Sequence, residues 1–314
     1  MSSPQQRKVR VALLSVASNT TLVVVKLLVG IAIGSVSVIS EGIHSGMDLL
    51  AAIIAFFAVR TSGQPEDEGH PFGHGKFENI SGAAEALLIF VAAVWIIVEA
   101  IHKLMRPTEM ESAPLGVAVM AASVGLNLFV SAKLFRVGRE TDSMALQADA
   151  WHLRTDVWTS AGVLSGLGII WIARRFFGVE LPWLDPVAAI AVALLIVHAA
   201  WELTRESVRD LLDVGLPEGE IEWIREYLDG HEASHGYHHL RTRKGGATRF
   251  IEFHLFVPPS MSVEHSHMVV EAIEDDMCER FPRAQVTIHV EPAEEGRVSD
   301  RRRAPAPIEA SRPE

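Results

Sequence analysis

The chain has little cysteine and no excess of positive charge. Its one cysteine, Cys278, excludes internal disulfide bonds and any zinc cluster built on several thiolates. The 39 acidic residues outnumber the 28 basic ones and give a formal net charge of −11, which disfavours binding to nucleic acid or to anionic lipid. The excess is uneven, because residues 202–314 hold 23 acidic and 14 basic residues. An acidic C-terminal part suits the handling of cations.

Apolar residues, by contrast, are abundant. They make up 49% of the chain and raise the mean hydropathy to +0.22, which is too apolar for an ordinary soluble protein. A run of about 20 apolar residues crosses a hydrocarbon core of ~30 Å. Runs of this length lie at 11–33, 36–59, 80–103, 113–135, 144–172 and 184–205. No small-residue cleavage site follows the first run, so we expect a span there and not a removed signal peptide. The sequence predicts an α-helical membrane protein with six transmembrane helices.

The distribution of basic residues predicts the orientation in the lipid bilayer. Six spans place both termini on the same side of the membrane. The segments on that side carry eight lysine and arginine residues, against four in the segments on the other side. Short loops rich in lysine and arginine stay in the cytoplasm. We therefore expect a multi-pass membrane protein with both termini in the cytoplasm.

Two apolar runs carry the same pair of residue types, His44 with Asp48 and His152 with Asp156. Four residues along a helix rotate by about 400°, so each pair lies on one face, one turn apart. Two nitrogens and two oxygens suit tetrahedral Zn²⁺, although Co²⁺, Fe²⁺ and Cd²⁺ accept the same ligands. Each aspartate alone has another interpretation, as a cap or a partner for a neighbouring helix. Because an aspartate at a helix centre costs about 2.5–3.5 kcal/mol, two such pairs favour a metal site on an ion pathway.

A further carboxylate precedes each histidine by one turn, Glu41 in the first motif and Asp149 in the second. Positions i, i+3 and i+7 face the same way on a helix. Two interpretations remain open. The carboxylates provide favourable charge near a helix N-terminus, or they act as a proton relay or as a second layer around the metal ligands.

The segment between the second and third runs offers another candidate site. Asp67, His70 and His74 lie in a stretch rich in proline and glycine, which predicts a loop and not a helix. From their spacing alone, metal ligands and solvated surface side chains remain equally good interpretations.

Beyond Pro217 the pattern changes to that of a small α+β unit. Residues 217–229 and 261–281 have helical patterns, and residues 236–243, 248–257 and 285–290 have strand patterns. The order αββαβ predicts a metallochaperone-like unit of about 80 residues, large enough for a small core. Eight of the fourteen histidines lie from His231 onward. Such a unit has no structural need for so many, and His254 and His289 lie in predicted strands from which they can converge with Glu291.

Several of these motifs together resemble those of the cation diffusion facilitators, six-span transporters that export divalent metals. The resemblance covers residues 10–292. It is carried by the two His/Asp signatures and by the loop Gln-Pro-x-Asp-x-x-His-x-Phe-Gly-His-Gly-Lys at residues 64–76. Leu-Arg-Thr-Arg at 240–243 and Thr-Arg-Phe-Ile at 248–251 also match. The resemblance implies a homodimer with a cytoplasmic N-terminus at 1–10, a membrane domain at 11–210 and a cytoplasmic metal-binding and dimerisation domain at 211–293. The tail at 294–314 is rich in proline, arginine and glutamate, so we expect it to be disordered.

The resemblance also assigns roles to residues. It implies a transport site formed by the two His/Asp pairs and a loop site formed by Asp67, His70 and His74. It further implies a binuclear regulatory site at the dimer interface. Its ligands would be His238, His254, His267, His289 and, where the family has aspartate, Glu291. A salt bridge between Lys76 and Asp213 would join the two domains. The short 133–143 loop favours a prokaryotic plasma membrane.

We therefore expect a homodimeric Zn²⁺/H⁺ antiporter, with zinc both transported and regulatory. An exporter of Fe²⁺, Co²⁺ or Cd²⁺ is the nearest alternative. An intramembrane zinc protease would need an open coordination position, a general base and an activated water. The sequence contains no His-Glu-x-x-His motif. A metal sensor without transport is hard to reconcile with ligands placed at membrane depth.

Overall fold

A computed structural model describes residues 3–33, 36–105, 114–172, 183–231 and 234–293. The chain divides into two compact units, Met1–Leu211 and Leu212–Glu314. The boundary expected from the sequence lies one residue earlier, after residue 210. The predicted disordered tail at 294–314 lies outside the described residues.

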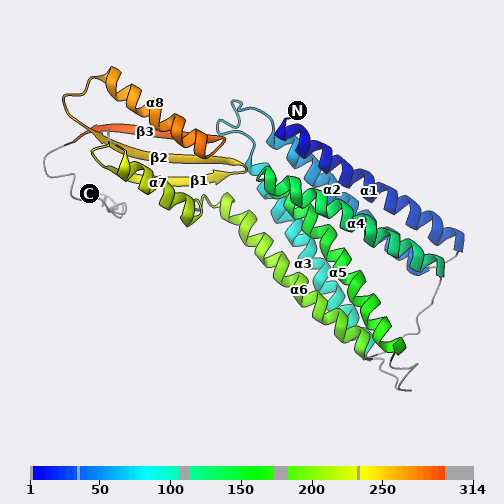
Figure 1. The fold of residues 1–314 in the computed structure, drawn as a ribbon. Coiled ribbons are helices and arrows are strands. Elements are labelled where there is room, and N and C mark those ends of the chain that lie inside the picture. Colours follow the sequence, from blue (N-terminus) through cyan, green and yellow to red (C-terminus); the bar gives the residue numbers. More distant parts are fainter. Residues whose placement is uncertain (1–2, 34–35, 106–113, 173–182, 232–233, 294–314) are drawn as a thin grey trace, which may run out of the picture. The chain divides into compact units, whose positions relative to one another are not determined.

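The described part of the first unit contains six long helices (Figure 1). They are α1 (Pro4–Ile33), α2 (Val36–Ser62), α3 (Lys76–Met105), α4 (Pro114–Glu140), α5 (Met144–Ile172) and α6 (Leu184–Leu211). Each predicted apolar run falls on one of these helices to within a few residues. The first helix begins earlier than its apolar run, so most of the predicted N-terminal segment 1–10 is helical.

Within the described residues, four segments are long and apolar enough to cross a membrane. These are Pro4–Ala32, Glu41–Ser62, Lys76–His102 and Pro186–Leu211. The predicted spans at 113–135 and 144–172 lie partly outside the residues to which this count applies. The predicted class, a helical membrane domain followed by an α+β domain, is confirmed.

Small residues allow the helices of the first unit to approach closely. Helix α1 packs mainly against α2, α3 against α6, and α4 against α5. Ala12, Ala58, Ala145 and Ala150 are buried in one cluster that joins α1, α2, α4 and α5. Lipid tails are as apolar as these side chains, so close packing and polar contacts, not apolar burial, hold membrane helices together.

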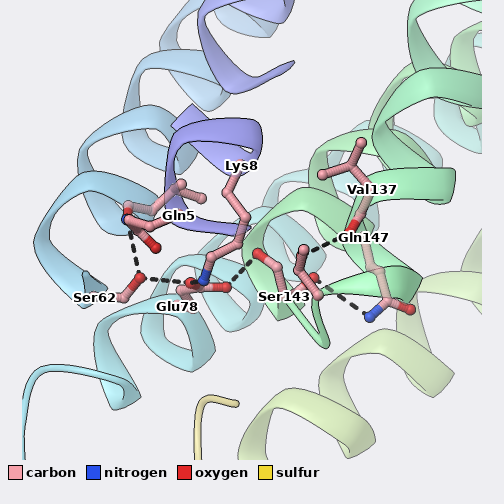
Figure 2. Close-up of polar contacts among 9 residues, drawn as sticks. Gln5, Lys8, Ser62, Glu78, Val137, Ser143 and Gln147 are labelled. Carbon is pink, nitrogen blue, oxygen red and sulfur yellow. Dashed lines mark hydrogen bonds and ion pairs between the residues drawn. The ribbon is translucent and has the colours of Figure 1, made fainter. Parts of the chain in front are cut away.

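A buried carboxylate joins several of these helices at one end of the bundle (Figure 2). The ammonium of Lys8 on α1 donates a hydrogen bond to Glu78 Oε1 at 2.5 Å, and Ser62 Oγ on α2 donates to the same oxygen at 2.5 Å. The hydroxyl of Ser143, just before α5, donates to Glu78 Oε2. We call these four residues the Glu78 junction. It fixes the start of α3 against three other elements.

The second unit has the predicted αββαβ order, which is confirmed. Its elements are α7 (Glu218–Gly230), β1 (Tyr237–Gly245), β2 (Thr248–Val257), α8 (Val263–Arg280) and β3 (Ala284–Pro292). The sheet order is β1-β2-β3, with β1 antiparallel and β3 parallel to the central strand. One apolar core joins the sheet to both helices. It includes Ile251, Phe253 and Leu255 of β2, Ile224 and Leu228 of α7, and Ile273 and Met277 of α8.

The register of the sheet aligns three histidines. His254 on the central strand is paired with His238 on β1 and with His289 on β3. Because side chains alternate along a strand, His254 points away from the face that carries Phe253 and Leu255. The β1–β2 register shifts between His238 and Arg241, where His239 has φ of 54°. This irregularity sets the position of His238 opposite His254.

The Glu78 junction generates a prediction about stability. In Lys8→Met the Glu78 carboxylate stays buried without its cationic partner, and the side chains of both residues are only 2–3% exposed. We expect the free energy of unfolding to fall by about 3–5 kcal/mol, measured by titration with a denaturing detergent in mixed micelles. The double variant Lys8→Met with Glu78→Gln removes both charges and should lose clearly less. Equal losses in the two variants would contradict this account.

Candidate metal-binding sites

The two His/Asp pairs of α2 and α5 come together inside the first unit. One ligand atom from each of His44, Asp48 and Asp156 lies within 4.8 Å of the others. The fourth predicted residue, His152, places its Nε2 atom 3.1 Å from Asp48 Oδ1. Asp48 and His152 are buried, whereas His44 is exposed. The structure thus brings three of the four predicted residues within ligand distance of one another and joins His152 to them through Asp48. We call these four residues the membrane site.

The donor atoms of the membrane site fit a divalent cation. Two imidazoles and two carboxylates provide nitrogen and oxygen ligands of the kind that tetrahedral Zn²⁺ takes. Two buried atoms, Asp156 Oδ2 and His152 Nδ1, have no hydrogen-bond partner among the described residues. A buried polar atom without a partner is costly. A cation bound here would give Asp156 Oδ2 a ligand role.

The two additional carboxylates, Glu41 and Asp149, have different surroundings. Glu41 places Oε2 3.4 Å from the ammonium of Lys26 on α1, and its side chain is 39% exposed. Asp149 is fully buried, and neither of its carboxylate oxygens has a hydrogen-bond partner in the described part of the chain. The sequence analysis left both roles open. The pairing of Glu41 with Lys26 could not be read from the motif, because Lys26 lies on another helix.

The loop between α2 and α3 forms a second group. Asp67 Oδ1 lies 3.2 Å from His70 Nδ1, and Asp67 Oδ2 lies 3.3 Å from His74 Nε2. The backbone N–H groups of Gly69 and His70 donate to Asp67 Oδ1 at 2.9 and 2.7 Å. The hydrogen bond from the His70 N–H is the main reason that the pKa of Asp67 is lowered. This carboxylate is therefore charged and held between two imidazoles, as a metal ligand must be.

The aligned histidines of the sheet form a third group with Glu291. Glu291 Oε1 lies 2.9 Å from His254 Nδ1, and Oε2 lies 3.1 Å from His238 Nε2. Burial alone raises the pKa of Glu291, but hydrogen bonds with His254 and His238 hold it below its ordinary value. The longer glutamate side chain thus reaches both imidazoles. His289 is more distant, with Nε2 3.8 Å from Glu291 Oε1, and His267 on α8 is not part of this group in the described residues.

The predicted salt bridge between Lys76 and Asp213 joins residues of the two units, so it stays a prediction. Lys76 is the first residue of α3. Asp213 belongs to the second unit, where its Oδ1 lies 3.7 Å from Arg243 Nη1. The sequence analysis did not anticipate this contact with Arg243, because it depends on how the segment before α7 meets β1.

The chain is similar to known proteins over nearly its whole length. The family model described as the cation efflux transmembrane domain matches residues 12–212. The model of the cation efflux protein cytoplasmic domain matches residues 216–293. The uncharacterized transporter sll1263 of Synechocystis is 38% identical over 263 residues, which are 83% of each chain. The cation-efflux pump FieF of Salmonella schwarzengrund is 30% identical over 283 residues, which are 90% of this chain and 92% of the relative.

A solved structure also matches part of the chain. The metal-bound C-terminal domain of the CzcD transporter from Thermotoga maritima is 33% identical, covers 24% of this chain and 87% of its own, and has a TM-score of 0.23. The two family models together account for the membrane helices, the loop and the sheet. The predicted family is confirmed, and its members are transporters and not enzymes. The chain belongs to the cation efflux family, the cation diffusion facilitators, and is a multi-pass membrane protein that exports divalent metal cations.

Proposed function

We propose that the protein is a homodimeric antiporter that exports Zn²⁺ in exchange for protons. Its place would be a bacterial plasma membrane, with both termini in the cytoplasm. The observation that carries the proposal is the convergence of His44, Asp48, His152 and Asp156 from α2 and α5. Zinc uptake into proteoliposomes under a pH gradient tests it. An enzyme or a sensor would give no flux, and an exporter of Fe²⁺, Co²⁺ or Cd²⁺ would move its own metal in preference.

The choice of zinc rests on the ligand types. Two imidazole nitrogens and two carboxylate oxygens can complete a tetrahedral shell, which is the usual geometry of Zn²⁺ with four protein ligands. Larger cations accept more oxygen ligands and benefit less from the two imidazoles. The membrane site provides no thiolate, since Cys278 lies in the second unit.

The contacts of the ligands without metal support the proposal of proton coupling. His152 Nε2 and Asp48 Oδ1 are 3.1 Å apart, so they share a hydrogen bond. Both atoms must give up that bond and be free of protons before they bind a cation. Metal entering from the cytoplasm would displace protons, and protons entering from the other side would displace the metal. Rocking of helix groups around the site would expose it to each side in turn.

The histidine group of the sheet supports regulation by zinc. The second unit carries much of the excess negative charge, so two copies in a dimer repel each other. Zinc held by His238, His254 and Glu291, with His289 and His267 as further predicted ligands, would reduce this repulsion. A bound metal shifts the equilibrium between two arrangements only by its difference in affinity for them. The regulatory site would therefore favour whichever arrangement brings the two copies together.

The membrane site predicts the result of removing a ligand. Asp48→Ala and Asp156→Ala each delete one of four ligands, so we expect zinc transport to fall by at least about 100-fold. Uptake into proteoliposomes measures the loss, and size-exclusion chromatography checks that the dimer is intact. Glu99→Ala is a matched control, because it removes an exposed carboxylate of α3 outside the site. Near-normal zinc flux in either folded aspartate variant would refute the assignment.

The ligand types also predict selectivity. His44→Asp replaces a nitrogen ligand with a hard oxygen ligand, so discrimination against Cd²⁺ and other larger cations should decrease several-fold. Competition uptake of Zn²⁺ and Cd²⁺ measures the ratio. The same substitution at His198, an exposed residue of α6, should leave the ratio unchanged. An unchanged ratio in His44→Asp would show that this residue does not determine selectivity.

Regulation generates a third expectation. The double variant His254→Ala with His289→Ala should transport zinc more slowly while the membrane site still binds metal. Transport rate and metal content, measured on the same preparation, separate the two effects. His265→Ala serves as a control, because His265 is exposed near the start of α8 and contacts only its capping residue Ser262 among the contacts described. Normal transport by the double variant would remove the case for regulation.

A further inference from the structure

A buried lysine lies beside the membrane site. Lys26 on α1 is only 7% exposed. Its ammonium donates a hydrogen bond to Ser45 Oγ at 2.8 Å and lies 3.4 Å from Glu41 Oε2. Ser45 directly follows His44 in the chain, and Glu41 precedes His44 by three residues. A positive charge is therefore held against the segment of α2 that carries one metal ligand.

The charge of Lys26 also reaches the ligands on α5. Of the charges expected to act on the Asp156 carboxylate, that of Lys26 is the weakest, after those of Asp48, His152 and His44. Charges inside a protein interact more strongly than charges in water, because the effective dielectric constant is lower. Lys26 is thus part of the charge balance of the membrane site, although it cannot be a metal ligand while it is an ammonium ion.

Two simpler roles do not account for this position. A snorkelling lysine extends its ammonium toward water at the membrane interface, but the side chain of Lys26 is 9% exposed and bonds a neighbouring helix. A closed ion pair would neutralise the lysine, but the shorter of its two contacts is with the neutral Ser45, and Glu41 Oε2 lies 3.4 Å away on a side chain that is 39% exposed. A net positive influence on the site remains.

We propose that Lys26 is a positioning residue whose fixed positive charge weakens the binding of the transported divalent cation and thereby speeds its release. The proposal rests on the proposed function, because it takes His44, Asp48, His152 and Asp156 as the ligands. Two carboxylates and two neutral imidazoles balance the charge of one divalent cation. A nearby ammonium repels that cation. An exporter needs an upper limit on its affinity for the transported cation, since a site that binds the cation too tightly does not release it.

The test uses the full chain in lipid nanodiscs, with His70→Ala and His254→Ala in every variant to disable the other two groups. Competition with a zinc-sensitive chelator gives the dissociation constant for Zn²⁺, and proteoliposomes give KM and kcat. In Lys26→Met we expect binding to tighten by at least about tenfold, with KM and kcat both reduced. Lys26→Arg keeps the charge and should stay within about threefold of the parent.

A substitution that changes the charge in the opposite direction separates the effect of charge on zinc binding from the effect of altered structure. Glu41→Gln removes a negative charge beside Lys26, so binding should weaken several-fold. If Lys26 and Glu41 only tie α1 to α2, both variants would change the dissociation constant in the same direction. Lys26→Gln replaces Lys26→Met if the latter fails to fold, and Glu41→Gln decides the question if neither folds. Unchanged or weaker zinc binding in a folded neutral Lys26 variant overturns the proposal.

Asp156→Ala in the same background shows whether the site itself is correct. If this variant binds zinc as the parent does, the proposed function has failed at its ligands. If it loses zinc binding while Lys26→Met binds zinc no more tightly than the parent, only the role of Lys26 has failed.

Discussion

The membrane unit depends on one constraint: a charged group that is removed from water needs an opposite charge beside it. Each buried lysine in the described part of this unit meets the constraint. Lys8 is paired with Glu78, and Lys26 faces Glu41. The membrane site meets the constraint only in part, because Asp156 Oδ2 has no hydrogen-bond partner among the described residues. The Lys8–Glu78 pair fixes the helices, whereas the incompletely paired charges of the membrane site are left to bind a cation.

The Glu78 junction and the loop between α2 and α3 are neighbours along the chain. The Glu78 junction joins the end of α2 to the start of α3, and the loop that carries Asp67, His70 and His74 connects the same two points. A metal ion in the loop would therefore bind residues whose ends are already fixed. His74 is buried and lies four residues before Glu78, in the segment that leads into the first turn of α3. Helix α3 packs mainly against α6. The loop group is thus connected directly to a helix of the bundle.

Sequence reasoning succeeded where periodicity alone determines geometry. The i, i+4 spacing of His44 with Asp48 predicted one face of a helix, and the alternating pattern of β2 predicted the strand that carries His254. It could not predict contacts that depend on register or on distant segments. The irregularity after His238 and the parallel crossover to β3 align the three histidines, and neither has a local signal. The Glu78 junction combines side chains from four separate elements, which a search along the chain cannot find.

Two of the three metal groups share an arrangement that explains how they can be ready without a metal. In the loop, the two oxygens of Asp67 face two imidazoles, and in the sheet the two oxygens of Glu291 do the same. Each carboxylate holds its histidines in place by contacts of 2.9–3.3 Å, so little ordering entropy remains to be lost when a cation binds. The same contacts must be broken for the cation to enter, which limits its affinity. In the membrane site the only hydrogen bond of the Asp48 side chain among the described residues is with His152, and in our proposal the second carboxylate, Asp156, and the charge of Lys26 adjust the affinity for the cation. Preorganised groups of the first kind suit sensing, while a site whose charges are adjusted from a neighbouring helix suits cargo that must be released.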